Sequence, residues 1–389
     1  MENIGQRIIN GDCLEVLKGI AENSVDSIVT DPPYELGFMG KKWDNTGIAY
    51  NVELWSECLR VLKPGGHLLA FSGTRTYHRM AVAIEDAGFE VRDMIEWVYG
   101  SGFPKSLNIG KAVDKLQGNE REVMPNPKAK QQTSAKDGIY GDYEATTHIS
   151  KGTSEWEGCG TALKPAHEPI CMARKPLSEK NVAENCLKWG TGGIDIDGSR
   201  VGTEGARFNG RSVDSDIYGK YGTDKLKEVY NYGRFPANLI HDGSEEVREC
   251  FPETKSQGHF NSKVKMVGHT LYEGGFKDFE QEDRKMNDSG NASRFFKSII
   301  YQAKASKVER GEGNFHPTVK PVALMEYLIN MVTPPSGTVL DPFGGSGTTA
   351  VASIKLKRNF ILIEREAEYI EIIKARVNKT NQDSELTLF

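Results

Sequence analysis

Residues 25–34 read VDSIVTDPPY, a mostly apolar run that turns abruptly into an acid, two prolines and a tyrosine. The first six residues are typical of a buried β-strand. Proline has no backbone N–H to donate to a neighbouring strand, so the strand should end at Thr30. Asp31 and Tyr34 would then project from the carboxyl end of that strand, which is where open α/β sheets bind their ligands.

Strands and helices are predicted to alternate on both sides of this stretch. The predicted strands are residues 7–10, 25–30, 67–73, 90–100, 164–177, 294–306, 337–343 and 359–364. The predicted helices are residues 13–20, 52–62, 76–88, 322–332, a segment that starts within 345–356, and 366–379. Such alternation indicates a parallel sheet that is covered by helices on both faces.

The middle of the chain lacks this periodicity, which suggests a division into domains. The core is expected to comprise residues 1–115, 160–177 and 292–380. A polar stretch, residues 116–159, predicts a loop-like insertion, and the glycine- and charge-rich residues 178–291 predict a second, irregular domain.

Composition and charge narrow the class of protein. The chain has 389 residues, a formal net charge of −5 and six scattered cysteines without the spacing of a zinc site. No apolar run approaches the roughly 18 residues that a membrane span needs, so no membrane partner and a cytoplasmic location are expected. The negative charge argues against bulk electrostatic coating of nucleic acid. Basic residues between 255 and 310 leave open either a local basic face or a mixed-charge surface.

A second informative stretch lies near the far end of the chain. Residues 339–352, VLDPFGGSGTTAVA, combine a strand, a glycine-rich turn and the start of a helix, and Glu364 follows Gly344 by 20 residues at the end of the next strand. This arrangement lets the backbone approach a nucleotide-like ligand while the acid holds ribose hydroxyls. The glycines alone are also compatible with a plain tight turn, and the absence of Gly-Lys-Ser/Thr disfavours a triphosphate loop.

The residues of DPPY suit chemistry on an aromatic amine. Asp31 and the carbonyl of Pro32 could both accept hydrogen bonds from one exocyclic NH2 group, Pro33 helps to keep these acceptors rigid, and Tyr34 could stack on the ring. The lone pair of such an amine is delocalised into its ring, and two acceptors would return it to the nitrogen while the carboxylate stabilises developing positive charge. A proline turn with a packing tyrosine is the structural alternative.

Together with HPTVKP at residues 316–321, these two stretches resemble the amino-methyltransferases of DNA that use S-adenosylmethionine. The DPPY motif precedes the glycine loop, which is the order of the circularly permuted β group. The resemblance implies a Rossmann-like, seven-stranded sheet with an inserted target recognition domain at residues 178–291. It also implies base flipping, S-adenosylmethionine as cofactor, double-stranded DNA as partner and a bacterial or phage setting.

The same resemblance assigns roles residue by residue. The residues assigned to the cofactor are Asp12, Thr318, Lys320, Asp341, Phe343, Gly344, Gly345, Gly347 and Glu364. Glu364 would hold the ribose, Asp12 would contact the adenine amine, and Thr318 and Lys320 would lie near the methionine end. A lone Asp before a helix is more often an N-cap, which is the alternative for Asp12, and His316 is compatible with a purely structural role. Asp31, Pro32, Pro33 and Tyr34 are the predicted catalytic residues, and no metal is expected.

The sequence favours one methylated amine without excluding the others. Asp rather than Ser at the head of DPPY favours adenine N6, with cytosine N4 as the alternative, in line with the adenine enzymes of this resemblance. Methylation of RNA or of a protein amide, or a non-enzymatic DNA-binding module, would suit the same residues. Neither motif contains a cysteine nucleophile, so methylation of cytosine carbon is not expected. A homodimer and a separate cognate restriction nuclease are both left open.

Overall fold

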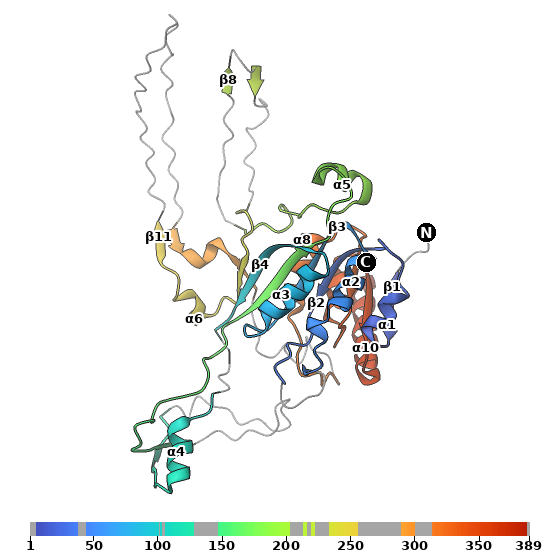
Figure 1. Cartoon of the computed structure of the whole chain (residues 1–389). Coiled ribbons are helices and arrows are strands. Elements are labelled where there is room, and N and C mark those ends of the chain that lie inside the picture. The colour runs from blue at the N-terminus through green and yellow to red at the C-terminus, as the bar shows by residue number, and fades with distance from the viewer. Residues whose placement is uncertain are drawn as a thin grey trace, which may run out of the picture.

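A computed structural model describes residues 5–37, 44–100, 102, 106–127, 147–202, 213–215, 219–221, 233–255, 289–299 and 313–386. Within these residues one sheet of nine strands forms the centre of the molecule (Figure 1). In spatial order its strands are β1 (Gln6–Asn10), β15 (Asn359–Glu364), β14 (Thr338–Asp341), β2 (Val25–Thr30), β3 (Leu62–Phe71), β7 (His167–Arg174), β4 (Glu90–Val98), β10 (Leu239–His241) and β13 (Lys297–Ser298). The first seven correspond to predicted strands; the short strands β10, which was not predicted, and β13, which lies in the predicted strand 294–306, extend the sheet to nine.

Strands from the two ends of the chain pair with each other in this sheet. β1 pairs in parallel with β15, and β14 pairs in parallel with β2 through Val339 with Ser27 and Leu340 with Ile28. The strands that precede DPPY and the glycine loop are therefore direct neighbours. Within the sheet only β7 runs antiparallel to the strands beside it, β3 and β4.

Helices cover both faces of the sheet, as the alternation predicted. They are α1 (Cys13–Lys18), α2 (Val52–Val61) and α3 (Tyr77–Asp86) on one face, and α8 (Val322–Val332), α9 (Thr348–Lys355) and α10 (Ala367–Leu386) on the other. Ile28 packs against the first set, whereas the next residue, Val29, packs against α8 and α9. Because successive strand residues point to opposite faces, the run VDSIVT supplies both cores.

The KPGG sequence, residues 63–66, lies between the predicted helix 52–62 and the predicted strand 67–73, but it is not a helix-to-strand turn. β3 begins directly at Leu62, and residues 63–66 form a bulge, since Val25 pairs with Leu62 but Ser27 pairs with His67. Gly65 has a φ of 78°, and a Cβ on Gly66 would lie 2.9 Å from the carbonyl oxygen of Asp26. The glycines thus permit the bulge and the close approach of two backbones.

The stretch from residue 178 was expected to leave the core, but its first part packs on it. Asn185 in α5 (Val182–Trp189) donates to the carbonyl of Pro64 at 2.8 Å, and Thr191 donates to the same carbonyl at 2.7 Å. The hydroxyl of Tyr327 donates to the carbonyl of Ser199 at 3.1 Å. These contacts are polar, which is why apolar periodicity did not reveal them.

The polar insertion is partly ordered rather than loop-like. It contains an antiparallel pair, β5 (Glu122–Pro125) with β6 (His148–Lys151), and α4 (Ile109–Gln117), most of which belongs to the residues expected in the core, leads into it. Arg121 ties this unit together by bonds to Asp114 and Glu157. In Figure 1, α4 lies well apart from the sheet.

The remaining elements are short. They are the helices η3 (Ile48–Tyr50), α6 (Glu245–Arg248) and η5 (Ala292–Phe295), the hairpin β8 (Val213–Ser215) with β9 (Gly219–Tyr221), and the pair β11 (Glu253–Lys255) with β12 (Ser289–Asn291). The predicted strand 294–306 is represented by η5 and β13, and its residues 300–306 lie outside the described residues. No helix in the described part of the chain is long and apolar enough to cross a membrane.

Candidate active site

The candidate site lies at the edge of the sheet where the parallel strands end. Asp31 follows β2, Asp341 is the last residue of β14, and Glu364 is the last residue of β15. β7 runs the opposite way, so its first residues, His167 and Glu168, come to the same edge. Three predicted acids and one that was not predicted therefore share one edge of the sheet.

Asp341 links three parts of the site through hydrogen bonds. Its buried carboxylate accepts hydrogen bonds from the Thr30 hydroxyl (2.6 Å), the Thr349 hydroxyl (2.6 Å) and the Phe343 amide (3.1 Å). Burial raises the pKa of Asp341 to about 6, although these hydrogen bonds favour the ionised form. The carboxylate joins the end of β2, the glycine loop and the start of α9.

The glycine loop requires glycine on conformational grounds. Gly345 and Gly347 have φ values of 52° and 80°, in the left-handed region that side chains disfavour. A Cβ on Gly344 would lie 3.2 Å from the carbonyl oxygen of Ile363. Arg376 of α10 donates a hydrogen bond to the carbonyl of Ser346 at 2.7 Å, which ties the loop to α10.

Two acids stand beside this loop at the ends of adjacent strands. Glu364 accepts hydrogen bonds from the amides of Gly345 (2.7 Å) and Glu366 (2.8 Å), and burial raises the pKa of its carboxyl. Asp12 caps α1 by accepting from the amides of Leu14 (3.0 Å) and Glu15 (3.4 Å) through one oxygen, Oδ1. The N-cap reading of Asp12 is therefore correct, and its assignment to the cofactor stays a prediction.

The HPTVKP segment also reaches the glycine loop. His316 donates through Nδ1 to the carbonyl of Thr318 at 2.6 Å, and its ring meets that of Tyr369 edge-on, with 4.5 Å between centroids. A Cβ on Gly345 would lie 3.3 Å from Nε2 of His316, so the imidazole lies against the loop. His316 thus shapes the segment and the loop together.

Lys320 lies among the predicted catalytic residues, and its assignment to the methionine end of the cofactor stays a prediction. Its Nζ is 2.7 Å from Oδ2 of Asp31, 3.1 Å from the hydroxyl of Tyr34 and 3.3 Å from Oε2 of Glu168. The Tyr34 hydroxyl in turn donates to Oε2 of Glu168 at 2.9 Å. We refer to Asp31, Tyr34, Glu168 and Lys320 as the charged cluster.

Opposite charges outweigh burial in this cluster. Burial alone would lower the pKa of Lys320, but Asp31 and Glu168 raise it above its ordinary value. Burial, followed by the two carboxylates, raises the pKa of Tyr34 well above its usual range. Lys320 is thus an ammonium ion and Tyr34 a neutral phenol at physiological pH.

One acceptor of the cluster stands out. Oδ1 of Asp31 is buried and has no hydrogen-bond partner among the described residues. A buried carboxylate oxygen without a donor is costly, by about 1–3 kcal/mol or more. The carbonyl of Tyr34 is fixed nearby by the Thr76 hydroxyl at 2.8 Å. An incoming ligand with an N–H group would supply the donor that Oδ1 of Asp31 lacks.

Glu168 is the residue that sequence reasoning missed. A strand was predicted at residues 164–177, and it forms β7 between β3 and β4, antiparallel to both. An acid at the start of an antiparallel strand lies at the ligand-binding edge. The sequence HEPI at residues 167–170 shows an acid near the start of a predicted strand, but the direction of that strand is needed to place the acid at this edge.

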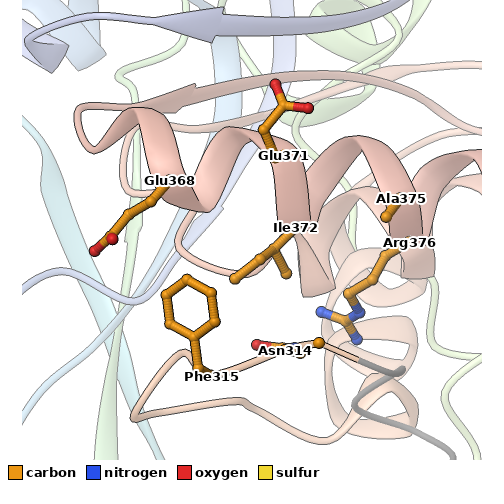
Figure 2. Close-up of a pocket in the computed structure, with 8 residues that line it drawn as sticks. Asn314, Phe315, Glu368, Glu371, Ile372, Ala375 and Arg376 are labelled. Carbon is orange, nitrogen blue, oxygen red and sulfur yellow. The ribbon is translucent and has the colours of Figure 1, made fainter.

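A separate pocket of about 240 Å³ lies against α10. Figure 2 shows Ile372 and Arg376 pointing from α10 toward Phe315 and Asn314. None of the predicted site residues lines it. In the part of the chain that the structure describes, no three His, Cys, Asp or Glu side chains are grouped so as to hold a metal ion.

Comparison with known proteins gives a family match. The profile of a family described as DNA methylase, comprising N6 and N4 methyltransferases, matches residues 25–375. Type II methyltransferase M.HindIII of Haemophilus influenzae is 23% identical over 401 aligned residues, which cover 92% of this chain and 90% of that protein. Type II methyltransferase M.HpaI of Haemophilus parainfluenzae is 36% identical over 117 residues, which cover 28% of this chain and 37% of that protein.

Solved structures are similar along nearly the whole chain but at low identity. The structure described as an M1.HpyAVI–SAM complex is 19% identical, covers 96% of this chain and 98% of its own, and has a TM-score of 0.42. The family match, by contrast, spans both motif regions and the stretch between them. The chain belongs to the N6/N4 DNA methylase family.

Proposed function

We propose that this protein transfers a methyl group from S-adenosylmethionine to the exocyclic N6 amine of adenine in double-stranded DNA, after flipping the base out of the helix. The observation that carries the proposal is the unpartnered, buried Oδ1 of Asp31 beside Tyr34 at the end of β2. An exocyclic NH2 group supplies the donor that this oxygen lacks. A base inside a duplex hides that group in the stack, so flipping is required, at a few kcal/mol.

The residues at the glycine loop suit S-adenosylmethionine, which supplies a methyl group on a sulfonium. Gly344, Gly345 and Gly347 allow a ligand to approach the backbone closely. Each oxygen of Glu364 accepts one hydrogen bond from a backbone amide. A carboxylate has about four acceptor positions, so Glu364 can still accept hydrogen bonds from ribose hydroxyls. Asp12 uses only Oδ1 for its cap and can offer Oδ2 to an amine.

Asp31 and Tyr34 would act on the target base. Oδ1 of Asp31 and the carbonyl of Pro32 accept the two amine hydrogens, which concentrates the lone pair on nitrogen, and Tyr34 stacks on the ring. The carboxylate stabilises the positive charge that develops on that nitrogen. Asp31 is also the base within reach of the proton that the methylated nitrogen must release.

Adenine is favoured over cytosine by the acid that heads the motif. Asp31 stands where cytosine-N4 enzymes of the resemblance more often have serine, and the family contains both activities. The two amines are chemically alike, so the choice rests on this one residue. Base identity is the part of the proposal that a direct measurement should address first.

The decisive experiment identifies the methylated nucleoside. Unmethylated genomic DNA is incubated with the protein and S-adenosylmethionine, digested to nucleosides and separated by mass spectrometry. The expected product is the N6-methyl derivative of deoxyadenosine. N4-methyldeoxycytidine would overturn the choice of base but not the reaction class, and methylation of RNA or protein in parallel assays without methylated DNA would overturn the substrate.

We further propose that DNA sequence recognition resides in residues 178–291, outside a core of residues 1–115, 160–177 and 292–380 and beside the insertion 116–159. The packing of residues 178–202 on β3 and α8, and the place of β10 in the sheet beside β4, narrow the candidate to the rest of this stretch beyond residue 202. The hairpin β8 with β9 lies away from the sheet in Figure 1, which suits a part that reaches toward DNA.

A further inference from the structure

Glu168 belongs to the charged cluster, yet the reaction proposed above gives it no part. Its Oε2 accepts the Tyr34 hydroxyl at 2.9 Å and lies 3.3 Å from Nζ of Lys320. The side chain is only 17% exposed. A mostly buried carboxylate that touches both partners of Asp31 is well placed to influence the catalytic acid without touching the substrate.

The fold holds Glu168 rigidly. In the register of the sheet, Glu168 of β7 pairs with Trp97 of β4, and Pro169 pairs with Glu96. β7 is hydrogen-bonded to strands on both sides. A side chain on an interior strand is positioned more accurately than one on a loop.

The cluster contains two carboxylates and one ammonium ion, so its net charge is negative. Lys320 is 2.7 Å from Oδ2 of Asp31 and somewhat farther from Glu168. If Glu168 were neutral, the ammonium would have Asp31 as its only anionic partner in the cluster. It could then bridge to Oδ1, the atom that is otherwise open to an amine.

We propose that Glu168 is a positioning residue: it anchors the Tyr34 hydroxyl and shares the Lys320 ammonium, which leaves Oδ1 of Asp31 open and negative for the target amine. The inference rests on the proposed function, since it requires Asp31 to receive an amine. A net negative cluster also favours the cationic nitrogen that forms during methyl transfer.

The test compares three variants in single-turnover methylation of unmethylated genomic DNA with radiolabelled S-adenosylmethionine. Glu168→Gln removes the charge and keeps the shape, and Tyr34→Phe removes the hydroxyl and keeps the ring. Glu90→Gln is the matched control. Glu90 lies on β4 and forms an ion pair (2.6 Å) with Arg174, which is at the opposite end of β7 from Glu168. Cofactor affinity is measured by calorimetry and folding by the thermal transition.

Glu168→Gln and Tyr34→Phe should each slow single-turnover methylation by about 10- to 100-fold, the effect of a misplaced reacting group. Their cofactor dissociation constants should stay within about threefold of wild type, because the loss falls on the chemical step rather than on ground-state binding. Glu90→Gln should keep the wild-type rate. If Glu168 had a purely structural role, Glu168→Gln would instead lower the temperature of the thermal transition, and the methylation rate would not fall independently of cofactor affinity.

A wild-type rate in folded Glu168→Gln would overturn the inference. If that variant does not fold, Tyr34→Phe decides, and a wild-type rate there overturns the anchoring role. Failure of the proposed function has a different signature, since the wild-type protein itself would then transfer no methyl group to DNA.

Discussion

Lys320 Nζ lies 2.7 Å from Asp31 Oδ2, although the two residues are 289 positions apart in the chain. The contact exists because β2 and β14 are neighbours and because the HPTVKP segment leads into α8 beside them. It joins the first motif to the third and occupies one oxygen of the acid. The other oxygen, Oδ1, is the acceptor on which the proposed chemistry depends.

Asp31→Ala should abolish methyl transfer, with a loss of at least about 10³-fold, because it removes an acceptor aimed at developing charge. Cofactor affinity should change by no more than a few fold, since Asp31 does not contact the glycine loop. The measurement is methyl incorporation into DNA alongside calorimetry with S-adenosylmethionine. Asp86→Ala, at the exposed end of α3, is the control. Activity retained in Asp31→Ala would remove the amine-acceptor role.

Glu364→Ala should weaken binding of S-adenosylmethionine by about 1–2 kcal/mol, the value of a hydrogen bond to a charged group. The loop should also loosen, because Gly345 loses the carboxylate that its amide contacts at 2.7 Å. Calorimetric titration measures the affinity. Glu366→Ala serves as the matched control, since Glu366 contacts Glu364 through its backbone amide and its side chain pairs with Arg365. Unchanged affinity in Glu364→Ala would contradict the ribose assignment.

The regular part of the fold was largely predictable from the sequence. Runs such as VDSIVT, apolar on both faces, and helices such as 322–332 have patterns that specify their own burial, and the structure confirms both. The bulge at residues 63–66 was not predictable, because KPGG is equally typical of a turn. Asn185 and Thr191 were missed for a related reason, since they attach α5 to the core by hydrogen bonds rather than by apolar contact.

The candidate site, like the fold, has one part that local sequence predicts and one part that it does not. The positions of Asp31, Gly345 and Glu364 follow from local motifs at strand ends, and the structure brings them to one edge. The contacts of Lys320 and Glu168 depend on the order and direction of strands in the sheet, which no local pattern encodes. Direction matters most for Glu168, because only an antiparallel β7 carries its first residues to the ligand edge.

Asp341 predicts a specific dependence of stability on pH. Its pKa is raised from 3.8 to about 6 in the folded protein, so between these values the native state binds more protons than the unfolded state. The free energy of unfolding contributed by this group therefore falls as pH rises from about 4 to 6 and stays low above that. The size of the effect is of the order of 1–3 kcal/mol, at 1.36 kcal/mol per pKa unit.

The variant Asp341→Asn isolates this contribution. An amide keeps an acceptor for Thr30 and can donate to the Thr349 hydroxyl, but it does not titrate. Urea unfolding at pH 4.5, 5.5 and 6.5 should show wild type losing stability relative to the variant as pH rises. Parallel curves for the two proteins would show that the carboxyl does not titrate in this range.

The division between core and recognition region can be tested by exchanging segments with M.HindIII, which aligns over 92% of this chain. Replacing residues 203–238 and 242–291, which leaves β10 in place, should give a protein that methylates the donor's DNA sequence, because the proposed base-reading contacts move with these segments. Replacing residues 178–202 should leave the sequence preference unchanged and lower stability, because Asn185 and Thr191 both bond to the carbonyl of Pro64. Sequencing that detects modified bases reads the preference, and thermal unfolding reads the stability. If the second exchange moved the preference and the first did not, recognition would have to be placed on α5 and its neighbours. Such an outcome would leave the catalytic assignments intact, since Asp31, Glu168 and Lys320 all lie outside the exchanged segments.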